Sequence, residues 1–393
     1  MRKYLSILTL FLSVTACIYP YTPDLEEAPE GILTVDANIS IGETSTVRLG
    51  TLQSLWKNSQ EDATVGKIWN DLSKATVWVE SDAGDTYPGT LIASTYGYSY
   101  LDPYNPVFAI PTDEAPADRR YRLVIEALDA TYTTDWNTLI QPPVIEEVEF
   151  AADDEMVTAL VSVNGGPDAT GYMLLSYDEA WEFHAEYPIT YKVDPNNWTV
   201  TELTSPDYSR YWCWKLSDNK RVYPVDYTAM SENGVKKYPL YSFLRTDNRN
   251  HKRYCLNLKV KSLSRETYRF LYNLESGSEG GDNLFTPNPG EIPGNIVCET
   301  DPDRTVLGYA IFSKTATKRF WLDSRYAKHK PGVTLDFAEF RRWSDLYKWD
   351  YRPVVEDPNP ELPGPYGWGP DFCYDCTAAG GTMRKPSYWD ETE

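Results

Sequence analysis

Histidine, positive charge and long apolar runs are all scarce in this sequence. Three histidines occur among 393 residues, and 37 Lys and Arg stand against 58 Asp and Glu, which gives a formal net charge of −21. A chain this acidic repels phosphate backbones and anionic lipid head groups. The composition therefore argues against nucleic-acid binding, and against membrane adhesion by charge alone.

The sequence shows no clear motif of a catalytic site or of a metal site. His184, His251 and His329 are isolated in the sequence, and no Gly-x-Ser-x-Gly elbow supplies a serine nucleophile. His184 follows Trp181 and Phe183, which favours packing in an aromatic strand over a role as general base. The acidic turns do not match the EF-hand pattern, and carboxylate pairs are expected by chance among so many acids. We therefore expect no catalytic residue, no metal ion and no cofactor.

The apolar run at the start of the chain is too short to span a bilayer, which needs ~20 residues. It extends from Tyr4 to Val14, follows a positively charged start at residues 1–3, and ends in Val14-Thr15-Ala16-Cys17. This order is typical of a secretion signal, and the last four residues resemble the lipobox of bacterial lipoproteins. We expect residues 1–16 to be the signal peptide and Cys17 to be the lipidation site. An ordinary signal peptide with a chance cysteine, or a buried helix, is the alternative.

A proline-containing acidic segment follows the cysteine. Residues 17–30 hold Pro20, Pro23 and Pro29 together with four acidic side chains. Such a composition stays extended and solvated. We therefore expect a lipidated tether between the membrane and the first folded domain.

Short alternating segments separated by turns predict β structure over most of the chain. Residues 76–80 and 121–127 alternate between two faces, with turn residues at 82–85 between them. This pattern predicts a β-sandwich at residues 31–142, either immunoglobulin-like or transthyretin-like. The prolines after Gln141 then indicate a boundary, followed by a larger, mainly-β domain over residues 143–393.

Two helices are expected within this second domain. Ser264 is a good N-cap, and apolar residues recur at helical spacing after it, which predicts a helix near residues 264–275. An aromatic stripe predicts another helix near residues 335–349. Both stripes are typical of a core rather than a cofactor site.

The five cysteines beyond Cys17 suggest disulfide chemistry, because an exported protein meets oxidising conditions. Zinc binding lacks support, since no second ligand pair accompanies the Cys-x-x-Cys motif in the tail. A bond within that motif, or a bond from either of its members to an earlier cysteine, remains open. The disulfide candidates are Cys213, Cys255, Cys298, Cys373 and Cys376.

Aromatic residues make up 14% of the chain, with 30 Tyr and 13 Trp. Rings in irregular segments can stack on sugars or grip a peptide, because they offer apolar area at low entropic cost. Tyr366 and Trp368 are the stronger candidates, since flanking Gly and Pro keep their loop open; Trp212 and Trp214 are the others. The alternative is that these rings fill domain interfaces.

Three stretches together resemble the domain-of-unknown-function 4249 family of Bacteroidota lipoproteins. They are the lipobox with Gly31–Ala37; Ser262–Pro287 with Ile292–Ile296 and Val306–Ala310; and Cys373–Cys376 with Gly380–Thr382 and Lys385–Pro386. The resemblance implies a lipid-anchored outer-membrane or cell-surface protein that works alongside a TonB-dependent transporter, with no established catalytic residues to transfer.

The leading hypothesis is therefore non-enzymatic capture or gating of a nutrient, either a peptide or a glycan, for a partner transporter. A surface adhesion or assembly protein is the second hypothesis, and an unrecognised hydrolase is the third. No nucleic-acid partner is expected.

Overall fold

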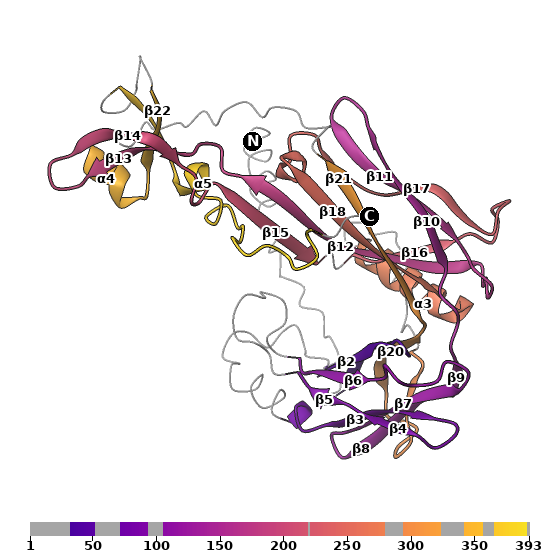
Figure 1. Ribbon diagram of the computed structural model, residues 1–393. Helices are drawn as coiled ribbons and strands as arrows, with labels where there is room; N and C mark the ends of the chain where they lie inside the picture. The colour runs from indigo at the N-terminus through magenta and orange to yellow at the C-terminus, as the bar shows by residue number, and fades with distance from the viewer. Residues whose placement is uncertain are drawn as a thin grey trace, which may run out of the picture.

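The computed structural model describes residues 32–51, 71–92, 105–218, 221–279, 294–323, 342–356 and 365–390. The predicted signal peptide, Cys17 and the tether lie outside the described residues. The fold is mainly β, as predicted, and consists of two β-sandwiches and an outlying lobe (Figure 1).

The first sandwich is built from two sheets whose strands alternate between buried and outward-facing residues. In β1, for example, Leu33, Val35, Ala37 and Ile39 are buried while the residues between them face outward. One sheet has the order β20-β1-β2-β6-β5; the other has the order β19-β8-β7-β3-β4, with β9 beside β7. The strands are β1 (Leu33–Ile39), β2 (Thr44–Thr51), β3 (Thr76–Ser81), β4 (Thr86–Pro88), β5 (Thr90–Leu91), β6 (Val107–Pro111), β7 (Arg120–Ala127), β8 (Ala130–Thr134), β9 (Asn137–Thr138), β19 (Ile296–Cys298) and β20 (Val306–Phe312).

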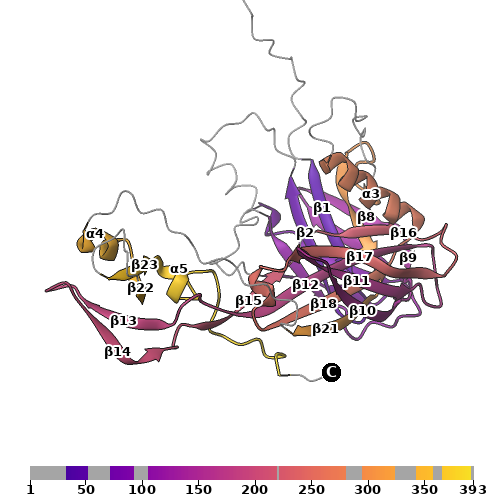
Figure 2. The same ribbon diagram turned by 90° about the horizontal axis from the view of Figure 1, so that it is seen from above.

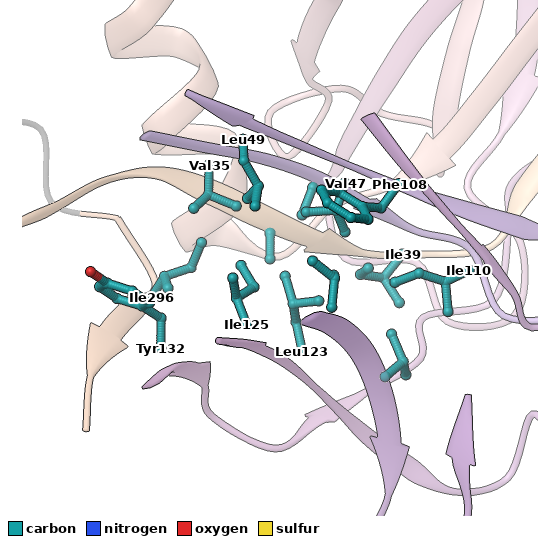
Figure 3. Close-up of a cluster of buried hydrophobic side chains, with 14 of the residues drawn as sticks. Val35, Ile39, Val47, Leu49, Phe108, Ile110, Leu123, Ile125, Tyr132 and Ile296 are labelled. Atoms are coloured by element: carbon teal, nitrogen blue, oxygen red, sulfur yellow. The ribbon is translucent and has the colours of Figure 1, made fainter. Parts of the chain in front are cut away.

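The two sheets enclose one aliphatic core (Figure 3). Val35, Ile39 and Val47 on one sheet point toward Leu123 and Ile125 on the other, and all five are buried. Burial of such side chains contributes about 1.5–3 kcal/mol each. The alternation of these strands is therefore what selects a sandwich.

The first sandwich is discontinuous in sequence. β20 lies parallel to β1, and β19 pairs with β8, so two strands between residues 296 and 312 complete sheets whose other strands come from residues 33–138. The predicted boundary after residue 142 assigned these strands to the second domain and is corrected by the pairings. Gly308, with φ +109°, permits the approach, since a Cβ there would lie 1.8 Å from the Val35 carbonyl oxygen.

The second sandwich joins a three-stranded sheet, β10-β11-β17, to a sheet of order β15-β12-β18-β21. The long strand β12 pairs with β16 in its first part and with β15 in its second, while β18 runs along its other edge. The strands are β10 (Val144–Ala152), β11 (Met156–Asn164), β12 (Tyr172–His184), β15 (Trp212–Asp218), β16 (Tyr223–Asp226), β17 (Gly234–Leu244), β18 (Arg253–Ser262) and β21 (Thr315–Asp323).

A buried polar network links the two sheets of this sandwich. Arg249, in the 3-10 turn η1 (Asn248–Asn250), donates two hydrogen bonds to Glu179 at 2.6 and 2.9 Å. Tyr254 donates to the same carboxylate at 2.9 Å and also contacts the hydroxyl of Tyr241 on the facing sheet. Burial is the main cause that raises the pKa of Tyr241 and of Tyr254 well above the usual value, so both hydroxyls keep their protons.

The predicted first helix is present as α3 (Arg265–Glu279), and the Ser264 hydroxyl accepts the backbone N–H of Thr267 at 3.1 Å, as an N-cap does. Phe270 of α3 stacks on Tyr309 of β20, with ring centroids 4.6 Å apart. Tyr268 of α3 stacks on Tyr172 of β12 with ring centroids 4.8 Å apart, so the helix packs against both sandwiches, and it lies beside β16 in both views (Figures 1 and 2). Residues 335–341 of the second predicted helix lie outside the described residues, and the rest of its predicted range contains the short helix α4 (Trp343–Lys348).

An outlying lobe reaches away from the two sandwiches in both views (Figures 1 and 2). Its small core joins Val193, Leu346 and Trp368. The lobe consists of β13 (Ile189–Asp194), β14 (Thr199–Asp207), α4, β22 (Arg352–Glu356), β23 (Tyr366–Gly369) and α5 (Asp371–Tyr374).

Candidate functional site

The outer face of the β15-β12-β18-β21 sheet carries the side chains that alternate away from the sandwich core. His184 of β12 lies directly opposite Trp212 of β15, and Glu182 lies opposite Trp214. Side chains opposite one another on paired strands share a face and touch. Strand register therefore brings a histidine and a tryptophan together at one end of this face.

Five rings gather at that end and form what we call the ring cluster: His184, Tyr208, Tyr211, Trp212 and His251. His184 stacks on Tyr211 with centroids 4.9 Å apart and on His251 with centroids 4.6 Å apart. Tyr211 meets both Tyr208 and Trp212 edge to face at 5.2 Å. These are the arrangements that aromatic pairs prefer, so each ring is held by its neighbours.

Two rings of the cluster face solvent. Tyr208 is 54% exposed and Trp212 is 37% exposed, while the other three are partly covered. Burial, and then the neighbouring Tyr208, raise the pKa of Tyr211, so its hydroxyl stays protonated at neutral pH. The ring cluster is thus an aromatic surface whose inner members fix its outer ones.

Ion pairs flank the ring cluster on two sides. Lys252 pairs with the buried Glu182 and places its ammonium 4.6 Å from the centre of the Trp212 ring. The other oxygen of Glu182 accepts the indole N–H of Trp389 at 3.3 Å. On the other side, Arg210 pairs with the buried Asp375. Burial alone would raise the pKa of Asp375, but hydrogen bonds from Thr377 and Arg210 hold it below the usual value.

The carboxyl-terminal tail is fixed beside the ring cluster. A disulfide joins Cys213 to Cys376, and Thr382 exchanges two backbone hydrogen bonds with Trp214 at 2.7 and 2.8 Å. Of the pairings that the sequence left open, the structure forms this one. Cys255, Cys298 and Cys373 are buried and take no part in the bond. In Figure 1 the yellow tail follows β15 toward the carboxyl end.

Two of the four candidate ligand-binding rings lie on β15, in different surroundings, and the other two lie on β23 in the lobe. Trp212 belongs to the ring cluster, whereas Trp214 packs beneath the tail against the buried Trp389. Trp368, expected in an open loop, is 1% exposed in the lobe core, and Tyr366 packs against it. This expectation is corrected: the flanking glycines belong to β23, which pairs with β22, and so the indole turns inward.

Sequence reasoning missed Tyr208, His251 and Lys252 as members of this surface. The histidines looked isolated because they lie on different strands or turns, and only the pairing of β12 with β15 and β18 brings them together. The one local signal was the density of aromatic residues around Trp212.

Within the described ranges, no group of three or more His, Cys, Asp or Glu side chains is arranged to hold a metal ion. In this part of the chain, no helix has the length and hydropathy of a membrane span.

The fold and the site define a mainly-β protein of two sandwiches with an aromatic surface site at the end of one sheet. The family model described as Domain of unknown function (DUF4249) matches residues 18–319, more than half of the 393-residue chain, so the chain belongs to the DUF4249 family. The ring cluster lies within this range, and the tail at residues 371–390 lies beyond it. A comparison with curated proteins finds no match.

Proposed function

We propose that this protein is a lipid-anchored outer-membrane protein, exposed at the cell surface, that captures a ligand and passes it to a TonB-dependent transporter. The observation that supports binding is the ring cluster. Exposed Trp212 and Tyr208 are held by edge-to-face contacts with Tyr211, so little side-chain entropy is lost when a ligand covers them. The sequence supports the anchor through the lipobox that ends at Cys17.

The composition of the ring cluster is that of a binding surface, with exposed rings at its centre and charged groups around them. Its two exposed rings are bordered by the ion pairs of Lys252 and Arg210. An apolar centre with a polar rim is the usual composition of a recognition surface. The proposal contains no catalytic step, and turnover of a bound ligand would contradict it.

The partner is tested by purifying the tagged full chain from its native outer membrane in mild detergent, followed by mass spectrometry. We expect a TonB-dependent transporter in a stoichiometric amount. Recovery of the protein alone would contradict the transporter role.

The anchor is tested by Cys17→Ala. We expect the processed variant to leave the membrane fraction, because the acyl chains can no longer attach. Cys298→Ala, which removes a buried thiol of the first sandwich, is the matched control and is expected to stay with the membrane. Retention of processed Cys17→Ala in the membrane would contradict the anchor.

A second candidate is adhesion or assembly at the cell surface. The lobe favours it, because Trp349 is 65% exposed and Phe372 is 46% exposed there. Co-purification of other surface proteins in place of a transporter would support this candidate.

A further inference from the structure

The charge of the ring-cluster rim is already balanced by the protein itself. Lys252 pairs with Glu182, and Arg210 pairs with Asp375; both carboxylates are buried, and both cationic heads are about half exposed. A third carboxylate, on Asp207 next to Tyr208 in the chain, accepts the backbone N–H of Ser209 at 2.8 Å. An acidic ligand would therefore find Lys252 and Arg210 already paired with carboxylates, and it would also meet the negative charge of Asp207.

The paired groups retain the capacity to bind hydroxyl groups. An ammonium and a guanidinium each have more donors than one carboxylate uses. Their exposed N–H groups can therefore donate to uncharged oxygens without breaking the pairs. The tyrosine hydroxyl of Tyr208, on the most exposed ring, can both donate and accept.

The backbone beside Trp212 is closed to an incoming peptide strand. Cys376 donates its N–H to the Arg210 carbonyl at 2.9 Å, and Thr382 takes both backbone groups of Trp214. The tail thus bonds to the backbone on each side of Trp212, at Arg210 just before β15 and at Trp214 within it. Main-chain pairing with an extended peptide, which needs an unpaired edge, has no place there.

From these observations, and resting on the proposed capture function, we propose that the ring cluster binds an uncharged oligosaccharide. The apolar face of a sugar ring covers the exposed parts of Trp212 and Tyr208, because sugar C–H groups present a flat apolar surface to an aromatic ring. The hydroxyl groups at the sugar edge accept hydrogen bonds from Lys252 and Arg210.

The test is isothermal titration calorimetry of the detergent-solubilised full chain against three sets of probes. The neutral probes are galactomannan, xyloglucan, mixed-linkage β-glucan and amylopectin; the acidic probes are polygalacturonate and chondroitin sulfate; the peptide probe is a tryptic digest of casein. We expect binding to at least one neutral probe, with an affinity that changes little between low and high salt, because no formal charge is exchanged.

Two tryptophan variants locate the binding. Trp212→Ala is expected to weaken binding of the neutral probe about tenfold or more, since a stacking surface is lost. Trp136→Ala is the matched control: Trp136 is 38% exposed and lies 5.0 Å from the Arg122 guanidinium, but it belongs to the first sandwich. Its affinity is expected to be unchanged, and circular dichroism checks that both variants are folded.

The outcomes separate this inference from the function on which it rests. Binding of acidic probes or peptides alone, or neutral binding that Trp212→Ala leaves intact, overturns the oligosaccharide assignment and leaves capture for a transporter standing. Absence of binding to every neutral probe also overturns the assignment. Loss of the transporter from the native purification overturns the capture function whatever the calorimetry shows.

Discussion

At the scale of single residues, the buried carboxylate of Glu179 is expected to contribute strongly to the stability of the second sandwich. It accepts two hydrogen bonds from Arg249 and one from Tyr254. We expect Glu179→Ala to lower the free energy of unfolding by about 3 kcal/mol, because the buried Tyr254 hydroxyl loses a charged acceptor and Arg249 keeps only its pair with Asp247 at 3.1 Å. Urea denaturation followed by tryptophan fluorescence measures the change.

The matched control is a pair of the same charges at the surface. Glu149 pairs with Lys237 at 2.8 Å, and both side chains are well exposed. Glu149→Ala is expected to cost less than about 1 kcal/mol. Equal losses in the two variants would show that burial of the Glu179 pair is irrelevant to its contribution.

A lysine buried between the two sandwiches gives stability a defined pH dependence. Lys261 of β18 donates to Asn38 and, at 2.9 Å, to Ser40 of the first sandwich. Burial lowers its pKa from 10.5 to about 8, Glu43 opposes that shift, and Lys259 adds to it. Between these two values the unfolded chain binds the proton and the folded chain does not. Stability therefore rises as the pH increases through this interval.

Lys261 is expected to add about 2 kcal/mol of stability between pH 7 and pH 9.5. The thiol of Cys373 offsets part of this gain above about pH 8.5, because burial raises its pKa to about 11 in the fold and it ionises earlier in the unfolded chain. The range stops there because Tyr241 and Tyr254 stay protonated in the fold but ionise near pH 10 when unfolded, which lowers stability at higher pH. Lys261→Met is expected to be more stable at pH 7 and to lose this slope. Lys318→Met, which removes an exposed lysine of β21, should keep it. A slope that survives in Lys261→Met would assign the effect to another group.

At the scale of elements, the sequence predicted correctly those strands and helices that depend on a few neighbouring residues. The alternation of β7 and the capping hydroxyl of Ser264 are properties of a few neighbouring residues, and both elements are present. The prediction that Trp368 lies in an open loop was wrong, because the surroundings of this ring depend on its pairing with β22 and on Leu346, and neither can be read from the residues next to it. Of the candidate rings, Trp212 lies in the surface cluster, yet no local signal points to its neighbour His251.

The tail is an element whose position depends on one covalent bond. The disulfide closes a separation of 163 residues and holds the segment after Cys376 along β15. Replacing both Cys213 and Cys376 by Ala is expected to lower stability by about 2–5 kcal/mol. Amide hydrogen exchange should accelerate at residues 371–390 first, because this segment has fewer buried contacts than the sandwich cores.

Cys298→Ala is the control, since it removes a buried sulfur from the first sandwich without opening a cross-link. It should leave exchange in the tail unchanged. Uniform acceleration across the chain in the double variant would instead mean that the bond stabilises the whole fold and has no particular effect on the tail.

At the scale of the whole molecule, the two sandwiches share one continuous run of chain. β20 ends at Phe312 in the first sandwich and β21 begins at Thr315 in the second. Ser313, between them, donates its hydroxyl to the Ser262 carbonyl at 2.8 Å, while its own carbonyl accepts from Ser40 at 3.3 Å. With so short a connection, separation of one sandwich strains the other.

This connectivity predicts that residues 32–142 do not fold alone. Without β19 and β20 the core loses Ile296, Ala310 and Phe312, and β1 gains a free edge that invites aggregation. We expect this fragment to show no cooperative thermal transition. Joining residues 294–313 to it through a flexible linker should restore one, because both missing strands return to their sheets. Cooperative unfolding of the shorter fragment at the temperature of the longer one would show that the late strands only decorate a sandwich that is already complete.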